Sequence, residues 1–258
     1  MRKDVQGSER GQDTMKVISI INQKGGVGKT TTALTLSAEL NEKGKRSLLI
    51  DLDAQRNSTA TKGQGADFSI YDVLVEGADI REAISESPTG DFIRGEKELF
   101  LIDGLEDTAL RDSLKPLSRK YDIVILDCPP SLGELTLNAL VASDYLIIPT
   151  VADYYSLKGM GDLIGIIKKV RSANKRLRVM GVLLTLHNER LKESKEMQSE
   201  LEAVTEALNT SLFMTTIRNS VKAREAQRNP KGLLKYRSAP ITQDYLALTD
   251  EVIERLDT

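Results

Sequence analysis

The sequence predicts an α/β fold in one domain, with a mostly parallel, twisted sheet flanked by helices on both faces. Short β-branched apolar runs alternate with longer segments of helical spacing, which is the pattern of βαβ units. Each short run is apolar throughout, as expected for strands that are buried on both faces. The composition, 258 residues with 40% apolar and 29% charged, is that of an ordinary globular chain.

Strands are expected at the short apolar runs 17–21, 47–50, 99–102, 123–126, 145–148 and 179–184, with 213–217 as a last strand. Helices are expected over 30–43, which Gly44 closes, and over 132–142, 156–173, 189–208 and 242–256. No linker rich in proline or glycine divides these elements, so residues 15–258 are predicted to form one domain. Residues 1–14 are polar and are expected to be a disordered arm.

The rare residue types exclude several kinds of site. With one cysteine, Cys128, the chain cannot form an internal disulfide or a cysteine-ligated metal centre from its own residues. The single histidine, His187, also argues against a histidine-rich metal centre. The apolar runs are far shorter than the ~18 residues of a membrane-spanning helix, and no apolar run opens the chain. We therefore expect a cytoplasmic protein.

Charge is distributed unevenly along the chain. The formal net charge is −2, but residues 158–237 carry +9 and the remainder carries −11. A basic segment on an otherwise acidic protein favours a surface that faces a polyanion.

The sharpest motif is a glycine-rich loop between the first predicted strand and the first predicted helix. Its sequence, QKGGVGKTT at 23–31, places glycines where the backbone must wrap around phosphate oxygens at a helix N-terminus. Lys29 supplies a positive charge for the β- and γ-phosphates, and the Thr30 hydroxyl can bind Mg²⁺. Gln23 stands where the ordinary pattern has its first glycine, and Lys24 adds a second lysine. The motif predicts a P-loop NTPase that binds ATP and Mg²⁺.

Two further strands end in carboxylates, which the metal and hydrolytic chemistry of a P-loop protein requires. Asp127 follows the apolar run 123–126 and is expected to hold Mg²⁺ directly or through water. Asp51 and Asp53 end another strand and, being two residues apart, share one face of an extended segment. One of them can contact the water shell of the metal, and the other can orient an attacking water. Strand-end solvation or helix capping is the alternative.

These motifs resemble those of a known family. The loop KGGVGKTT at 24–31 is the deviant Walker A motif of the ParA/MinD group of P-loop ATPases. The segments DLDAQRN at 51–57, DCPPSL at 127–132, LTLNAL at 135–140 and PTVADYYSLKG at 149–159 resemble motifs of ParA/Soj partition proteins. The resemblance extends from residue 16 to about residue 256 and indicates the ParA/Soj group.

The resemblance implies an ATPase of weak basal activity that segregates plasmids or chromosomes. ATP closes two copies into a sandwich dimer, and the dimer binds double-stranded DNA without sequence preference. Hydrolysis, stimulated by a ParB-type partner, releases the DNA. In such a dimer Lys24 reaches the phosphates of the other protomer and acts catalytically in trans.

Position by position, the resemblance assigns the remaining site residues. The phosphates are held by Lys24, Gly25, Gly26, Val27, Gly28 and Lys29, with Thr31 at the α-phosphate. Mg²⁺ is held by Thr30, Asp51 and Asp127, and Asp53 positions the hydrolytic water, so the catalytic residues are Lys24, Lys29 and Asp53. The adenine is bordered by Arg218 and Asn219, where many relatives have Pro-Arg. Two departures, Ala54 for the usual proline and Arg56 for an often small residue, lie outside the presumed chemistry.

Basic residues late in the chain are the expected DNA contacts, because each neutralised phosphate releases counterions. They are Lys168, Lys169, Arg171, Lys222, Arg224, Arg228, Lys231, Lys235 and Arg237. Aromatic residues are not interleaved with them, so duplex phosphates are favoured over stacked single-stranded bases. Dimerisation would double this surface and link ATP to DNA affinity. The resemblance therefore implies a nucleoid-associated protein.

Two other functions are compatible with the motifs. A MinD-like regulator that cycles on membranes needs a C-terminal amphipathic helix with a basic face, whereas the polar face of 246–258 is acidic. A cargo-positioning ATPase shares the same motifs, and DNA binding by its ATP state would separate it from a partition protein. We expect no membrane partner.

Overall fold

A seven-stranded sheet organises the computed structural model, which describes residues 15–63, 65–153, 160–187 and 195–257. The strand order is β3-β4-β2-β5-β1-β6-β7, and every pairing is parallel except that of β3 with β4. The strands are β1 (Lys16–Ile20), β2 (Ser47–Asp51), β3 (Ile84–Ser85), β4 (Phe92–Ile93), β5 (Ile123–Asp127), β6 (Tyr145–Val151) and β7 (Arg178–Thr185). The expected arm at 1–14 lies outside the described residues.

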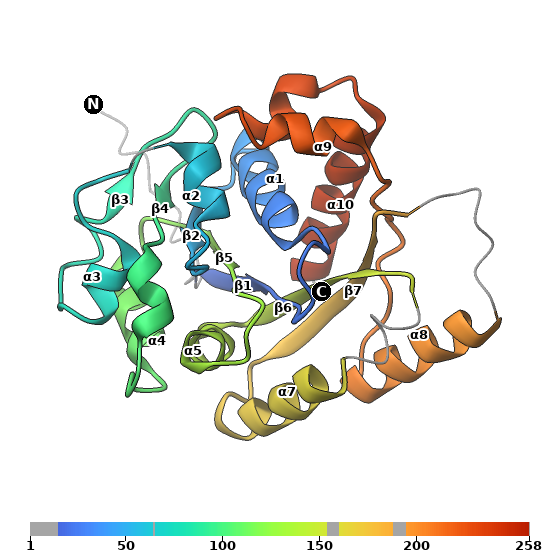
Figure 1. Ribbon diagram of the computed structural model, residues 1–258, viewed down its shortest axis with the longest axis horizontal. Coiled ribbons are helices and arrows are strands. Elements are labelled where there is room, and N and C mark those ends of the chain that lie inside the picture. The colour runs from blue at the N-terminus through green and yellow to red at the C-terminus, as the bar shows by residue number, and fades with distance from the viewer. Residues whose placement is uncertain (1–14, 64, 154–159, 188–194, 258) are drawn as a thin grey trace, which may run out of the picture.

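Helices cover both faces of this sheet (Figure 1). One face carries α1 (Lys29–Glu42), α9 (Val221–Ala226) and α10 (Pro240–Leu256). The other carries α4 (Ala109–Leu114), α5 (Glu134–Ala142), α7 (Gly161–Ala173) and α8 (Lys195–Leu208). The connections contain α2 (Asn57–Lys62), α3 (Ile70–Leu74) and the 3₁₀ turns η1 (Lys97–Leu101), η2 (Lys115–Leu117) and η3 (Gly232–Tyr236).

Each face of the sheet has its own apolar core. Along β1, Val17 belongs to the core under α5 and α7, whereas Ile18 and Ile20 belong to the core under α1 and α10. Because both faces of a parallel strand are buried, its sequence is apolar throughout rather than alternating. The predicted fold class, a single α/β layer structure with helices on both faces, is confirmed.

One predicted strand is wrong. Residues 99–102 were expected to enter the sheet, but η1 occupies 97–101 there and the exposed fractions of Phe100 and Leu101 are 81% and 66%. The position beside β2 is taken instead by β4, with β3 antiparallel to it at the edge. These two-residue strands are too short to show an apolar periodicity in the sequence.

The predicted last strand at 213–217 is also absent as a regular strand. This segment follows β7 through single bridges, in which Phe213 donates its N–H to the Val182 carbonyl and Ile217 donates to Leu184. The helix expected to begin at 156 begins at Gly161, after its N-cap Met160. The described part of the helix expected from 189 is α8, and 188–194 lie outside the described residues. Within the described residues, no helix has the length and apolar content needed to cross a bilayer.

Candidate nucleotide site

The phosphate loop joins β1 to α1 at the carboxyl edge of the sheet, where ligands bind in open α/β folds. Gly26 and Gly28 have φ angles of 75° and 88°, a left-handed conformation that glycine adopts without strain. Gly28 precedes α1 and no side chain caps that helix, so its first N–H groups are directed at the loop. This is the geometry that binds phosphate oxygens.

Neighbouring strands hold the loop in place. The Asn22 amide donates to the Pro149 carbonyl at 2.7 Å, and its oxygen accepts the Lys24 N–H at 2.9 Å. From β7, the Thr185 hydroxyl donates to the Val27 carbonyl at 2.8 Å. These contacts fix the loop before any ligand binds.

The two lysines of the loop differ in their surroundings. Lys29 is 7% exposed and its ammonium donates to the Lys24 carbonyl at 3.1 Å. Burial lowers the pKa of Lys29, and the nearby carboxyls of Asp127 and Asp53 act against this shift. The Lys24 side chain is 44% exposed, and its ammonium lies 2.8 Å from the Asp153 carboxylate. Lys29 faces inward to the loop, whereas Lys24 is at the surface.

Asp51 and Asp127 lie side by side, as paired residues at the ends of β2 and β5. Burial raises the pKa of Asp127 to about 7, with the Asp51 carboxyl adding to the shift, and burial raises the pKa of Asp51 to about 6. Asp51 uses its oxygens within the protein: one accepts the N–H and hydroxyl of Thr59 at 2.8 and 2.7 Å, and the other accepts the Asp53 N–H. Asp51 therefore fixes α2 and the turn before it.

Asp127 has one oxygen left for a ligand. Its Oδ2 accepts the Ser58 hydroxyl at 2.7 Å, but its Oδ1 is buried with no hydrogen-bond partner among the described residues. The Thr30 hydroxyl is close by, and it is one of the groups that act to lower the Asp127 pKa. A buried, unpartnered carboxylate oxygen next to a hydroxyl is a donor set that suits Mg²⁺.

Asp53 lies at the wall of a cavity of about 630 Å³ that opens in front of the phosphate loop. Its carboxylate accepts the Gln55 N–H at 3.0 Å, and it is 7% exposed. Gln55 and Asn57 from the same turn also line the cavity, together with Gly25, Gly26, Gly28, Lys29, Thr30 and Thr31. The cavity thus brings together the loop and one of the three predicted carboxylates. Gln55 and Asn57 belong to the quoted motif at 51–57 and could have been proposed from it.

The far wall of the cavity comes from the segment around α9. Of the two residues expected to border the adenine, Asn219 lines the cavity and Arg218 does not: the Arg218 guanidinium pairs with the Asp244 carboxylate, with Nε to Oδ2 at 2.7 Å. Arg224, expected at a DNA surface, lines the cavity and forms no ion pair or hydrogen bond with any described residue. Of these two arginines, Arg224 therefore lines the cavity and Arg218 does not.

The predicted DNA contacts do not form one continuous surface in a single protomer. Lys168, Lys169 and Arg171 lie on α7, whereas the remaining predicted DNA contacts lie around α9 and η3 on the opposite face of the sheet (Figure 1). Some of these residues are engaged within the chain. Arg171 donates to the Leu177 and Leu208 carbonyls, and Arg237 pairs with Glu39 and Glu42.

Comparison with known proteins identifies the family. The AAA domain family matches residues 15–179. The sporulation initiation inhibitor protein Soj of Bacillus subtilis is 37% identical over 254 residues, covering 92% of this chain and 98% of that protein. The chromosome-partitioning ATPase Soj of Thermus thermophilus is 36% identical over 252 residues, covering 93% and 96%.

Two solved structures are similar to this chain over nearly its whole length. Cobyrinic acid a,c-diamide synthase from Mycobacterium smegmatis, with bound ADP and magnesium, is 28% identical with a TM-score of 0.76, covering 95% of this chain and 96% of that one. McdA from Cyanothece has a TM-score of 0.80 over 93% and 99% of the two chains, and its 22% identity supports the fold alone.

The fold and the phosphate loop define a P-loop nucleotide-binding protein. The chain belongs to the AAA domain family and, within it, to the ParA/Soj group of partitioning ATPases.

Proposed function

We propose that this protein is an ATPase that partitions DNA, using Mg²⁺ and ATP to switch its affinity for the duplex. The observation that carries the ATPase part of the proposal is the buried, unpartnered oxygen of Asp127, set beside Thr30 at the phosphate loop. The partition part is supported by relatives that are named as chromosome-partitioning proteins. Its relatives are named as ATPases, and the M. smegmatis structure holds ADP and magnesium on the same fold.

The chain's own residues suit the hydrolytic step. Lys29 and the N–H groups at the start of α1 bind the phosphates and neutralise their charge. Asp127 and Thr30 hold Mg²⁺, and Asp51 supports that site by fixing α2. When bound, Mg²⁺ stabilises the charge that develops on the phosphate oxygens. Asp53 holds the attacking water in line with the γ-phosphate, and Val27 and Thr31 complete the cradle.

Lys24 completes the site of a second protomer in this proposal. Its ammonium is at the surface and is paired with Asp153, in a partly exposed ion pair that is cheap to exchange for another anion. A phosphate of the other protomer's nucleotide is such an anion. Dimerisation therefore depends on ATP, and Lys24→Ala keeps nucleotide binding while preventing closure.

DNA binds, in this proposal, through the exposed basic residues near α9 and η3, with those of α7 as a second region. Residues of α9 line the nucleotide cavity. A bound nucleotide can therefore shift α9 and, with it, the nearby basic residues Lys222, Arg228, Lys231 and Lys235. Arg224 and Asn219 contact the nucleotide instead. A ParB-type protein stimulates hydrolysis, and the protein works in the cytoplasm on the nucleoid.

The test is retention on a random-sequence duplex against salt concentration, with ATP, with ADP and without nucleotide. We expect retention with ATP alone, falling steeply with salt, and none for Lys24→Ala. Two variants of equal charge change separate the basic regions: Lys222→Ala with Lys231→Ala should weaken retention more than Lys168→Ala with Lys169→Ala. Intact ATP hydrolysis without retention in any state would contradict DNA partition and favour a cargo-positioning or MinD-like ATPase.

A further inference from the structure

The turn that carries Asp53 is supported by a segment that is distant in the sequence. Residues Arg94, Gly95 and Glu96 follow β4, and we call them the brace. A Cβ atom on Gly95 would lie 2.9 Å from the Asp51 carbonyl oxygen and 3.3 Å from that of Asp53, so the two backbones are in close contact. The Gly95 N–H also donates to the Thr59 hydroxyl at 2.9 Å, and this hydroxyl donates to Asp51.

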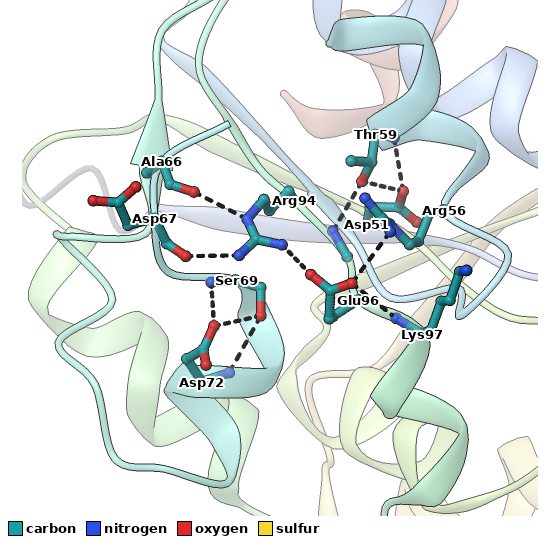
Figure 2. A network of polar contacts seen from close by, with 11 residues as sticks. Asp51, Arg56, Thr59, Ala66, Asp67, Ser69, Asp72, Arg94, Glu96 and Lys97 are labelled. Atoms are coloured by element: carbon teal, nitrogen blue, oxygen red, sulfur yellow. Dashed lines mark hydrogen bonds and ion pairs between the residues drawn. The ribbon is translucent and has the colours of Figure 1, made fainter. Parts of the chain in front are cut away.

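Glu96 joins the brace to the turn through its side chain, as Figure 2 shows. One carboxylate oxygen lies 3.2 Å from Nη1 of Arg56, and the other accepts from Arg94. Arg94 is held in turn by the Ala66 and Asp67 carbonyls, to which it donates at 2.9 and 2.6 Å. Glu96 is thus placed by Arg94 so that it meets Arg56.

Arg56 is the residue through which this contact reaches Asp53. Its backbone is left-handed, with φ 59° and ψ 35°, a conformation that is unfavourable for a residue with a Cβ atom. In that conformation its N–H donates to the Asp53 carbonyl at 2.8 Å and closes the turn. The turn places Asp53, Gln55 and Asn57 at the cavity wall.

We propose that Arg56 and Glu96 are positioning residues for ATP hydrolysis, holding the Asp53 turn in its working conformation through their ion pair. The proposal rests on the ATPase function proposed above. Neither residue lines the nucleotide cavity, and the phosphate loop is supported by other contacts, so nucleotide binding does not depend on the pair. The Arg56 and Glu96 side chains are 34% and 24% exposed, and Glu96 is shared with the partly buried Arg94. Because the pair contacts the Asp53 turn and not the phosphate loop, we expect it to affect the rate of hydrolysis rather than nucleotide affinity.

Two variants test the pair by a split between kcat and KM. Glu96→Gln keeps the shape and removes the charge, and we expect kcat for ATP to fall about tenfold with KM within about twofold of the native value. Arg56→Ala deletes the side chain but keeps the left-handed strain, so we expect the same loss of kcat, whereas Arg56→Gly, which adopts this conformation without the ion pair, should lose less. Arg56→Lys, which retains the charge, should recover part of the rate.

Arg46→Gln is the matched control, because it breaks an ion pair with Asp122 next to the opposite end of β2. We expect it to leave both kcat and KM unchanged. A native kcat in Glu96→Gln, or equal losses in kcat and nucleotide affinity, would overturn the positioning role. If the native protein itself hydrolyses no ATP, the ATPase proposal fails instead, so the two failures are distinguishable.

Discussion

The phosphate loop and the Asp53 turn form two walls of one cavity, and they are built in different ways. Both need left-handed backbone: the loop has it at Gly26 and Gly28, and the turn has it at Arg56. Glycine adopts this conformation without help, whereas an arginine must be held in it. The loop is therefore encoded locally, and the turn depends on the brace some forty residues further along the chain. We therefore expect substitutions in the phosphate loop to lower ATP affinity, and substitutions in the Asp53 turn to lower the rate of hydrolysis.

The largest effect is expected at the loop. Lys29→Ala removes a buried cation from the phosphate loop, whose ammonium donates to the Lys24 carbonyl and lies near the carboxyls of Asp127 and Asp53. We expect ATP affinity to fall by about 100-fold or more, since charge-assisted hydrogen bonds to phosphate are lost. Equilibrium titration with a fluorescent ATP analogue measures this. If Lys29→Ala bound ATP with native affinity, the phosphate loop would not be what determines nucleotide binding, and the contrast with the Asp53 turn would be wrong.

A smaller effect, of a different kind, is expected at the turn. Asp53→Ala should leave ATP affinity within about threefold, because no part of the phosphate cradle changes. Its hydrolysis rate should fall about 100-fold, which is the usual cost of losing a group that orients the nucleophile. Single-turnover hydrolysis measures the rate, and the same protein should stay on DNA after ATP is added. Hydrolysis at the native rate would remove the role assigned to Asp53.

The same contrast explains what the sequence could predict. The phosphate loop, the parallel sheet and the carboxylates at strand ends depend on contiguous residues, and each was recognisable. Arg218 is held by Asp244 in α10, and Arg224 lines the cavity because α9 lies at its wall. Neither placement could be predicted from the type of the side chain alone. Arg56 was assigned no part in the site because its partner, Glu96, lies in a connection without periodicity.

The smallest predicted effect is a pH dependence of stability. It arises from the buried carboxyls of Asp51 and Asp127 near the Asp53 turn, and not from the lysine of the phosphate loop. Burial raises the pKa of Asp51 to about 6 and that of Asp127 to about 7, well above the unfolded value. Below about pH 4 both carboxyls are protonated in either state and the shift favours the folded protein fully. Between about pH 4 and pH 7 the unfolded chain ionises these carboxyls while the folded protein keeps them protonated, so this stability is lost progressively over that range.

We therefore expect the nucleotide-free protein to melt about 5 °C lower at pH 8 than at pH 5.5, measured by calorimetry without Mg²⁺. Asp127→Asn should remove much of this difference, because the carboxyl with the more strongly raised pKa no longer ionises. Asp112→Asn is the control: Lys115 lowers the pKa of that exposed carboxyl to about 2, so it stays ionised over the whole range. Equal pH dependence in the native protein and Asp127→Asn would mean that the buried carboxyls do not titrate as a pair, and that the unpartnered Asp127 oxygen is neutralised by another group.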